Sequence, residues 1–228
     1  MVNKSKYKVI ILIGPPGSGK GTQAKMLAEK LKLFHLQTSK LGEAKINDPE
    51  LVKNDPEVAE AKKLYDSGGL FSPEWIQKLV LEKVKELVAQ NKGIIFDGSP
   101  RTLDEAEKEL PELESVFGRE NIKIIKINLS EYESLKRNSH RRVCKLNQHP
   151  IPNFPEFENV KICPEDGSEI ILRSLDDPET IKTRYKVYME ETYPVFDFFK
   201  SKGYNITEIN GEQPIENVQK DILNKLND

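Results

Sequence analysis

The chain has 228 residues, of which 37% are hydrophobic and 32% are charged. Its 35 Lys and Arg residues nearly balance its 37 Asp and Glu residues, so the formal net charge of −2 predicts no general attraction to nucleic acid or to an anionic membrane. The first apolar run is too short for a signal peptide, and no stretch approaches the ~20 apolar residues of a membrane span, so we expect a cytoplasmic protein. The length suits one large core, or a core that carries smaller inserted segments.

The first predicted elements are a buried strand at residues 6–13 and an amphipathic helix at residues 22–31, joined by the glycine-rich loop GPPGSGKGT. Glycines in such a loop let backbone N–H groups close around phosphate oxygens, and the helix N-terminus adds partial positive charge. Lys20 is predicted to reach between β- and γ-phosphates, and Thr22 to hold Mg²⁺. These features indicate an enzyme that binds a nucleotide and transfers phosphoryl groups.

Four further strands are predicted downstream, with helices between them, at residues 33–37, 93–97, 123–129 and 204–209. Ser72 and Pro73 are typical of a helix cap and first helical residue, and an apolar stripe follows them. This alternation predicts an α/β fold with a parallel five-stranded sheet flanked by helices, and ligands bound beyond the carboxyl ends of the strands. Thr22 and Asp97 then lie on the same rim.

Two segments interrupt the alternation. Residues 40–71 are charged and contain two Asn-Asp-Pro triplets, whereas residues 144–173 contain four prolines and show little helical periodicity. We expect both to be inserted, mobile covers, because structureless loops of this length are uncommon in compact domains. Long surface loops without a function are the alternative.

A second motif, DGSPRT, follows the predicted strand that ends at Asp97. Asp97 is placed to hold Mg²⁺ directly or through water, Gly98 permits close approach of a base or ribose, and Arg101 offers a bidentate fork to a phosphate. The motif therefore places a carboxylate, a tight turn and a guanidinium group at the predicted ligand rim.

Further arginines follow at positions 137, 141, 142, 173 and 184. If residues 132–143 form a helix, Arg137 and Arg141 share one face and meet a single polyphosphate, while Arg184 approaches from the next helix. Phosphoryl transfer spreads charge over a loose transition state, so it requires positioned cations more than a base. Solvated charge on a helix surface is the alternative for each arginine.

The two motifs together resemble the signatures of adenylate kinases, which are nucleoside monophosphate (NMP) kinases with a P-loop NTPase-type fold. The resemblance covers nearly the whole chain and implies a monomer that binds ATP and a nucleoside monophosphate. It implies a single chain made of a core at residues 1–37, 72–143 and 174–228, an NMP-binding insert at 38–71 and a lid insert at 144–173.

The same resemblance implies roles for individual residues. Those implied in catalysis are Lys20, Arg101, Arg137, Arg141, Arg173 and Arg184. Those implied in ATP binding are Gly17, Ser18, Gly19, Lys20, Gly21, Thr22, Arg137 and Gln213, with Thr22 and Asp97 holding Mg²⁺. Those implied in monophosphate binding are Thr38, Gly42, Phe71, Gly98, Arg101, Glu105, Arg173 and Arg184.

The acceptor segment departs from the family pattern. Glu43 occupies the place of the arginine that binds the acceptor phosphate, Lys40 that of an aspartate, and Ser99 that of an aromatic residue. Glu105 stands where a glutamine commonly reads adenine; its carboxylate accepts from a 6-amino group but donates nothing to N1. The expected acceptor is AMP, giving two ADP from Mg·ATP. The same chemistry on CMP, UMP or dAMP, or a nucleotide-binding protein that has lost transfer activity, stays open.

The predicted lid contains the only two cysteines, Cys144 and Cys163. One disulfide is an alternative, but in a reducing compartment metal binding is favoured. By resemblance to adenylate kinases with a structural zinc, Cys144, Cys163 and Asp166 are ligands, while Asn147 stands in the place of the remaining cysteine. His149 then supplies a fourth ligand for tetrahedral Zn²⁺; a metal-free lid is the alternative.

Overall fold

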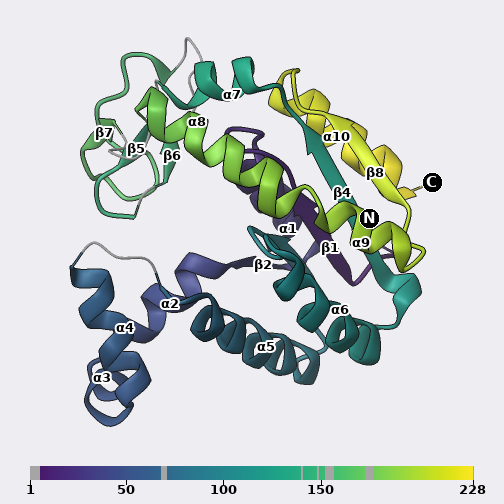
Figure 1. Cartoon of the computed structure of the whole chain (residues 1–228). Coiled ribbons are helices and arrows are strands. Elements are labelled where there is room, and N and C mark those ends of the chain that lie inside the picture. The colour runs from purple at the N-terminus through teal and green to yellow at the C-terminus, as the bar shows by residue number, and fades with distance from the viewer. Residues whose placement is uncertain are drawn as a thin grey trace.

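The computed structural model of the chain describes residues 6–67, 71–139, 141–147, 149–151, 157–172 and 177–227. Its central element is a sheet of five parallel strands in the order β2-β3-β1-β4-β8 (Figure 1). The strands are β1 (Val9–Ile13), β2 (Phe34–Gln37), β3 (Ile94–Asp97), β4 (Ile122–Asn128) and β8 (Ile206–Asn210). The predicted α/β fold with a parallel five-stranded sheet is therefore confirmed.

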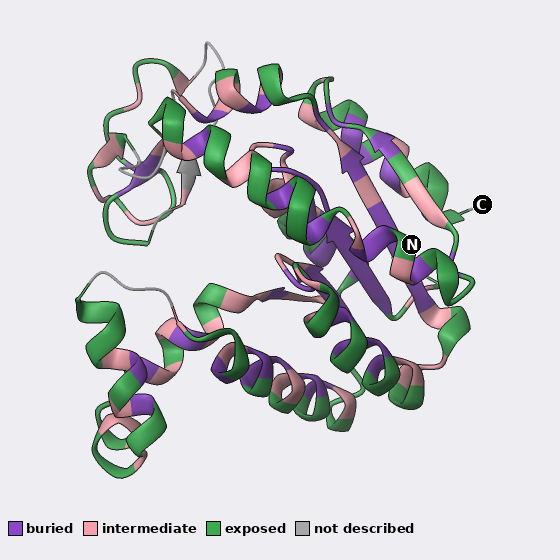
Figure 2. Cartoon of the chain, viewed as in Figure 1, coloured by how far each residue is buried: buried purple, intermediate pink, exposed green. Residues whose placement is uncertain are grey.

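Helices cover both faces of the sheet, because successive side chains of a strand point to opposite faces. In β1, Ile10 and Leu12 pack under α1 (Lys20–Leu31) and α10 (Ile215–Asn227). The opposite face of β1 packs against three helices, α5 (Pro73–Ala89), α6 (Leu103–Phe117) and α9 (Val195–Ser201). The central strands β1 and β3 are almost entirely buried (Figure 2).

The charged segment after β2 is helical. It forms α2 (Thr38–Ile46), α3 (Pro49–Asn54) and α4 (Pro56–Asp66), which share a small core with the first half of α5. The two Asn-Asp-Pro triplets begin α3 and α4: each aspartate accepts two backbone N–H groups of the following turn, and each proline occupies the first helical position. These triplets therefore begin helices.

A second small unit follows α7 (Glu131–Asn138). It is an antiparallel sheet in the order β6-β5-β7, built from β5 (Arg142–Cys144), β6 (Pro150–Ile151) and β7 (Ile170–Leu172). Helix α8 (Pro178–Val187) and a π-helical segment at Tyr188–Thr192 then lead back to α9. Figure 1 shows the small sheet and helices α2 to α4 on the same side of the molecule.

The prediction of one helix over residues 132–143 is wrong. Helix α7 ends at Asn138, where the hydroxyl of Ser139 donates to the carbonyl of Leu135. Arg142 instead begins strand β5, and its guanidinium group donates to the carbonyls of Phe157 and Val160. Pairing within the small sheet therefore ends the helix, and Arg137 and Arg141 do not share a helical face.

Among the described residues, no helix is both long and apolar enough to cross a membrane.

Replacement of Phe96 tests the sheet core. Phe96 is completely buried in β3, so Phe96→Ala is expected to lower the free energy of unfolding by about 3–5 kcal/mol, through lost burial and a residual cavity. Urea denaturation followed by circular dichroism measures this change. Tyr132→Ala, at a position 76% exposed, is the matched control and is expected to stay within about 0.5 kcal/mol of wild type. Equal effects of the two substitutions would contradict the packing described.

Candidate functional site

The glycine-rich loop joins β1 to α1 at the carboxyl rim of the sheet. Gly17 and Gly19 have φ angles of 78° and 85°, which favour glycine because other residues are strained there. A Cβ atom on Gly14 would lie only 2.6 Å from the carbonyl oxygen of Ile127, so a side chain does not fit there either. Close packing thus explains Gly14, and backbone conformation explains Gly17 and Gly19. The loop that these residues form places the first turn of α1 at the rim.

Lys20 folds back over this loop. Its Nζ donates to the carbonyls of Gly14 at 2.6 Å and Pro15 at 3.0 Å. Burial lowers the pKa of Lys20 to about 8; the charge of Asp97 opposes this effect, and three arginines add to it, namely Arg101, Arg184 and Arg141. Three of the predicted catalytic arginines, which lie far apart in the sequence, are therefore brought close to Lys20.

Asp97 ends β3, directly beside α1. A Cβ atom on Gly21 would lie 3.3 Å from Oδ2 of Asp97, so the first turn of the helix and this carboxylate are neighbours, as predicted. His35 Nε2 lies 3.0 Å from the same oxygen, and the Gln37 amide donates to it at 3.3 Å. Burial alone would raise the pKa of Asp97, but the hydrogen bond to His35 and the charge of Lys20 hold it below its usual value.

The DGSPRT turn is held by three local hydrogen bonds. Arg101 donates through Nε to the carbonyl of Gly98 at 2.7 Å, and its backbone N–H donates to Oε2 of Glu105 at 2.6 Å. The Thr102 hydroxyl accepts from the N–H of Glu105 and so caps α6. One oxygen of Glu105, predicted to contact the acceptor base, is thus engaged in holding the turn.

The divergent acceptor segment pairs its own charges. Glu43 accepts from Lys40 at 2.7 Å, one helical turn away on α2, where Thr38 is the first residue. Gly42 makes room for Phe71: a Cβ atom there would lie 2.5 Å from its ring, which stacks on Tyr65 with centroids 5.0 Å apart. The negative charge of Glu43 is therefore compensated within the segment.

The remaining predicted residues lie at the other side of the rim. Arg137 on α7 forms an ion pair with Glu133 at 2.9 Å. Hydrogen bonds from Ser130 lower the pKa of Glu212, and the charge of Arg137 adds to this effect, so Arg137 lies near the turn between β8 and α10. Gln213, in the same turn, donates through its amide to Asn210 and Asp221. Arg173 lies outside the described residues.

Two residues that support the loop were missed by sequence analysis. Ser134 donates to the carbonyl of Pro16 at 2.7 Å, and Asn138 lies where a Cβ atom on Gly17 would be 2.6 Å from its amide nitrogen. Both are buried, although α7 is highly charged. The only indication in the sequence was that these two residues are uncharged and lie four positions apart on a charged helix, a spacing that places both on one face. His35 and Gln37, the partners of Asp97, were also not predicted.

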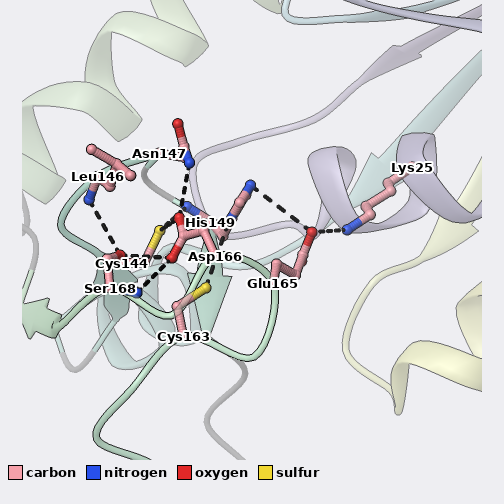
Figure 3. A network of polar contacts seen from close by, with 9 residues as sticks. All are labelled: Lys25, Cys144, Leu146, Asn147, His149, Cys163, Glu165, Asp166 and Ser168. Atoms are coloured by element: carbon pink, nitrogen blue, oxygen red, sulfur yellow. Dashed lines mark hydrogen bonds and ion pairs between the residues drawn. The ribbon is translucent and has the colours of Figure 1, made fainter.

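Four candidate metal ligands converge in the small sheet (Figure 3). They are Cys144, His149, Cys163 and Asp166, and their ligand atoms all lie within 4.8 Å of one another. His149 Nδ1 lies 3.5 Å from Sγ of Cys163 and 3.3 Å from Oδ2 of Asp166. In a tetrahedral zinc site with bonds of about 2.0–2.3 Å, neighbouring ligands lie about 3.3–3.8 Å apart, so the four residues fit Zn²⁺.

The surroundings of these four residues suit a cation. Hydrogen bonds from Ser168 and Cys144 hold the pKa of Asp166 far below its usual range, so this carboxylate is ionised. Asn147, which stands in place of a cysteine ligand, donates to Asp166 at 2.9 Å. The two cysteines are not joined in a disulfide, and burial raises the pKa of the Cys163 thiol. Asn147 therefore supports the candidate ligand Asp166, while His149 is the fourth member of the candidate ligand set.

An ion pair links this cluster to the core. Glu165, next to Asp166, binds Lys25 of α1 at 2.7 Å and lies 3.9 Å from Nε2 of His149 (Figure 3). Lys25 lies on the helix that begins with the phosphate loop. The small sheet and the loop are thus connected by charged side chains.

Comparisons with known proteins agree with this arrangement. A family model described as Adenylate kinase matches residues 12–204. An adenylate kinase of Petrotoga mobilis is 37% identical over 223 residues, which is 95% of this chain and 96% of that protein. Adenylate kinases of Oceanobacillus iheyensis and Caldicellulosiruptor bescii are 36% and 34% identical, over 93% and 95% of this chain and 96% and 98% of their own length. The site contains a phosphate loop, an aspartate at the end of the adjoining strand and converging arginines. Together with these similarities, the site shows that the chain belongs to the adenylate kinase family of phosphotransferases.

Proposed function

We propose that the protein transfers the terminal phosphoryl group of Mg·ATP reversibly to AMP, giving two ADP. The observation that carries the proposal is that Lys20, at the sheet rim, lies within the electrostatic reach of Asp97 and of three arginines, Arg101, Arg184 and Arg141. Such a cluster suits a transition state whose negative charge is spread over several phosphate oxygens. Family membership supports transfer to a nucleoside monophosphate, and AMP is the acceptor that this family membership favours.

On the donor side, the N–H groups of Gly17 to Thr22 would surround the ATP phosphates. Lys20 would exchange its bonds to the loop carbonyls for bonds to phosphate oxygens, which replaces neutral partners by charged ones. Arg137 and Gln213 would lie beside the nucleoside. Their place near the turn after β8 supports this assignment.

Thr22 and Asp97 would hold Mg²⁺ through a hydroxyl and a carboxylate, which are the hard oxygen ligands that this ion prefers. The low pKa of Asp97 keeps the carboxylate ionised, and His35 and Gln37 fix its orientation. When bound, the ion neutralises charge on the β- and γ-phosphates. The protein's own charged groups contribute through their positions around the phosphates.

On the acceptor side, Arg101, Arg173 and Arg184 would bind the phosphate of the monophosphate. Thr38, Gly42, Phe71, Gly98 and Glu105 would line its nucleoside. Because Lys40 already neutralises Glu43, that acid repels an incoming phosphate less than an unpaired carboxylate would. This supports a working acceptor site despite the divergent segment.

Residues 38–71 and 144–173 would act as the monophosphate-binding insert and the lid. Each has a small apolar cluster distinct from the two main clusters, although that of helices α2 to α4 meets α5 and the main core at Leu41 and Ile76, and this suits segments that move as units. Closure over the bound nucleotides would exclude water, which otherwise accepts the phosphoryl group. Structural Zn²⁺ held by Cys144, His149, Cys163 and Asp166 would stabilise the lid.

Initial rates of phosphoryl transfer from Mg·ATP test the proposed acceptor. The panel contains AMP, CMP, UMP, GMP and their deoxy forms, and ADP formation is measured with purified protein. A clear preference for AMP is expected. Preference for another base would place the change in specificity at Glu105, Gly42 and Ser99. ATP binding without transfer to any acceptor would contradict the proposed enzyme.

Replacement of Lys20 tests the phosphate loop. Lys20→Met is expected to lower kcat by about 10²–10³-fold, because a cation next to the transferred group is lost, with the fold intact by circular dichroism. Lys30→Met, an exposed position on the same helix, is the matched control and should retain wild-type turnover. Near-normal turnover of Lys20→Met would remove this lysine from the mechanism.

Metal analysis tests the lid. Protein purified without chelator is expected to carry one zinc per chain, and chelation should lower Tm because ligand binding stabilises the folded state. His149→Ala should reduce the retained zinc at least about tenfold, since a ligand is lost. Glu169→Ala, at an exposed ion pair of the same unit, is the control. Zinc-free protein with an unchanged Tm after chelation would mean that packing alone holds the lid.

A further inference from the structure

A buried glutamate lies behind the DGSPRT turn. Glu109, on α6, is 2% exposed, and so is Ser99 of the turn. Oε1 of Glu109 is hydrogen-bonded to the Ser99 hydroxyl, while Oε2 has no hydrogen-bond partner among the described residues. A buried carboxyl group with one partner for two oxygens is costly when it is charged, because the lost hydration is not replaced.

The carboxyl group avoids this cost by keeping its proton. Burial raises the pKa of Glu109 to about 8; the Ser99 hydrogen bond opposes this effect, and the charge of Glu105 adds to it. The neutral carboxyl buries no charge, and one of its oxygens accepts a hydrogen bond from the Ser99 hydroxyl. At neutral pH, Glu109 is therefore an uncharged hydrogen-bonding group.

The contact between Ser99 and Glu109 anchors the turn more deeply than its other hydrogen bonds do. The bonds of Arg101 and Thr102 with Glu105 reach only the first turn of α6. Glu109 lies one turn further along, beside Ala106, Leu110 and Leu113 in the main core. Ser99 thus ties the turn to the middle of a packed helix; Gly98 precedes it directly in the sequence, and Arg101 follows two residues later.

The other charges around α6 are mostly in solvated positions. Helix α5, which packs against α6, lines a surface groove with Glu74, Lys78, Glu82 and Lys85, opposite Lys108 of α6. On α9, Asp197 and Lys200 pair with each other, and Arg119 at the far end of α6 pairs with Glu114. Glu105 is the charged group that acts on Glu109, and its sign favours the neutral form.

We propose that Glu109 is a positioning residue for the acceptor site: its neutral carboxyl fixes Ser99, and with it the turn that presents Gly98 and Arg101, so that loss of its proton weakens monophosphate binding. The inference rests on the proposed function of this turn. On deprotonation the proton passes to water, and the new carboxylate has one hydroxyl donor and a like charge at Glu105. Its hydration requires the turn to open, and only the fraction of molecules with a closed turn binds the acceptor.

The pH dependence of AMP binding tests this proposal. KM for AMP, KM for ATP and kcat are measured from about pH 7 to pH 9, where the AMP phosphate stays fully ionised. Only molecules with a protonated Glu109 and a closed turn bind AMP, and their fraction falls about tenfold per pH unit above the pKa of Glu109. KM for AMP should therefore rise about tenfold by pH 9. Calorimetric titration with AMP alone gives the same affinity without catalysis.

Glu109→Gln separates charge from shape. The amide is neutral at every pH and its oxygen still accepts from the Ser99 hydroxyl, so KM for AMP should stay flat where that of wild type rises. Ser99→Ala removes the hydrogen bond between the turn and Glu109. The KM of this variant for AMP should be raised at all pH values and should not rise further between about pH 7 and pH 9. Glu107→Gln, at an exposed position of the same helix, should keep the wild-type profile.

A step that persists in Glu109→Gln would overturn the proposal and assign the titration to another group, such as Lys20, which acts on ATP. A protein that phosphorylates AMP with a flat wild-type profile would overturn it too, while leaving the proposed function standing. Absence of any transfer would instead defeat the proposed function, and the calorimetric profile would still test Glu109.

Stability provides an independent readout. The unfolded chain releases the Glu109 proton above about pH 4.3, whereas the folded chain keeps it to about pH 8. The folded state therefore binds more protons between these values, so wild-type stability falls as pH rises through this window. The Tm of wild type should fall relative to that of Glu109→Gln between about pH 5 and pH 8. Parallel curves would overturn the proposal, because the carboxyl would then not be buried in its neutral form.

Discussion

The parallel pairing of β1 with β3 is the constraint on which the rest of the site depends. Its register sets Leu12 opposite Asp97, so the phosphate loop and the DGSPRT turn leave the sheet at the same level. Both strands are buried on both faces, and the polar groups that follow them emerge only at the carboxyl rim. A slip of one residue would reverse the faces of β3 and bury Asp97 in the core.

Electrostatics at the rim follow from this geometry. Lys20 is desolvated and lies near three guanidinium groups, with Asp97 as the opposing charge that acts on it. A polyphosphate would relieve the repulsion among these cations and would give Lys20 anionic partners in place of loop carbonyls. The buried support of the loop from Ser134 and Asn138 keeps this arrangement in place before a ligand arrives.

Helices α2 to α4 and the small sheet achieve stability in different ways. Helices α2 to α4 use aspartate caps and a small apolar core that includes Trp75 of α5. The small sheet has fewer apolar residues, and its core contains two of the four candidate metal ligands. Small cores bury little surface, so a bound metal contributes most where apolar burial is least.

Local pattern by itself determined the parallel α/β sheet, the glycine loop and the position of Asp97, because apolar runs, β-branched residues and glycines act on their near neighbours in the chain. It failed for residues 132–143, where pairing within the small sheet ended the helix at Asn138 and separated Arg137 from Arg141. Only the tertiary structure joined His35 to Asp97 and Ser99 to Glu109, whereas the set of His149, both cysteines and Asp166 was already predicted by resemblance and the structure brings its members together. The physical reason is burial: a polar side chain acquires its partner and its protonation state from residues that the fold packs around it, and these lie far away or on another element.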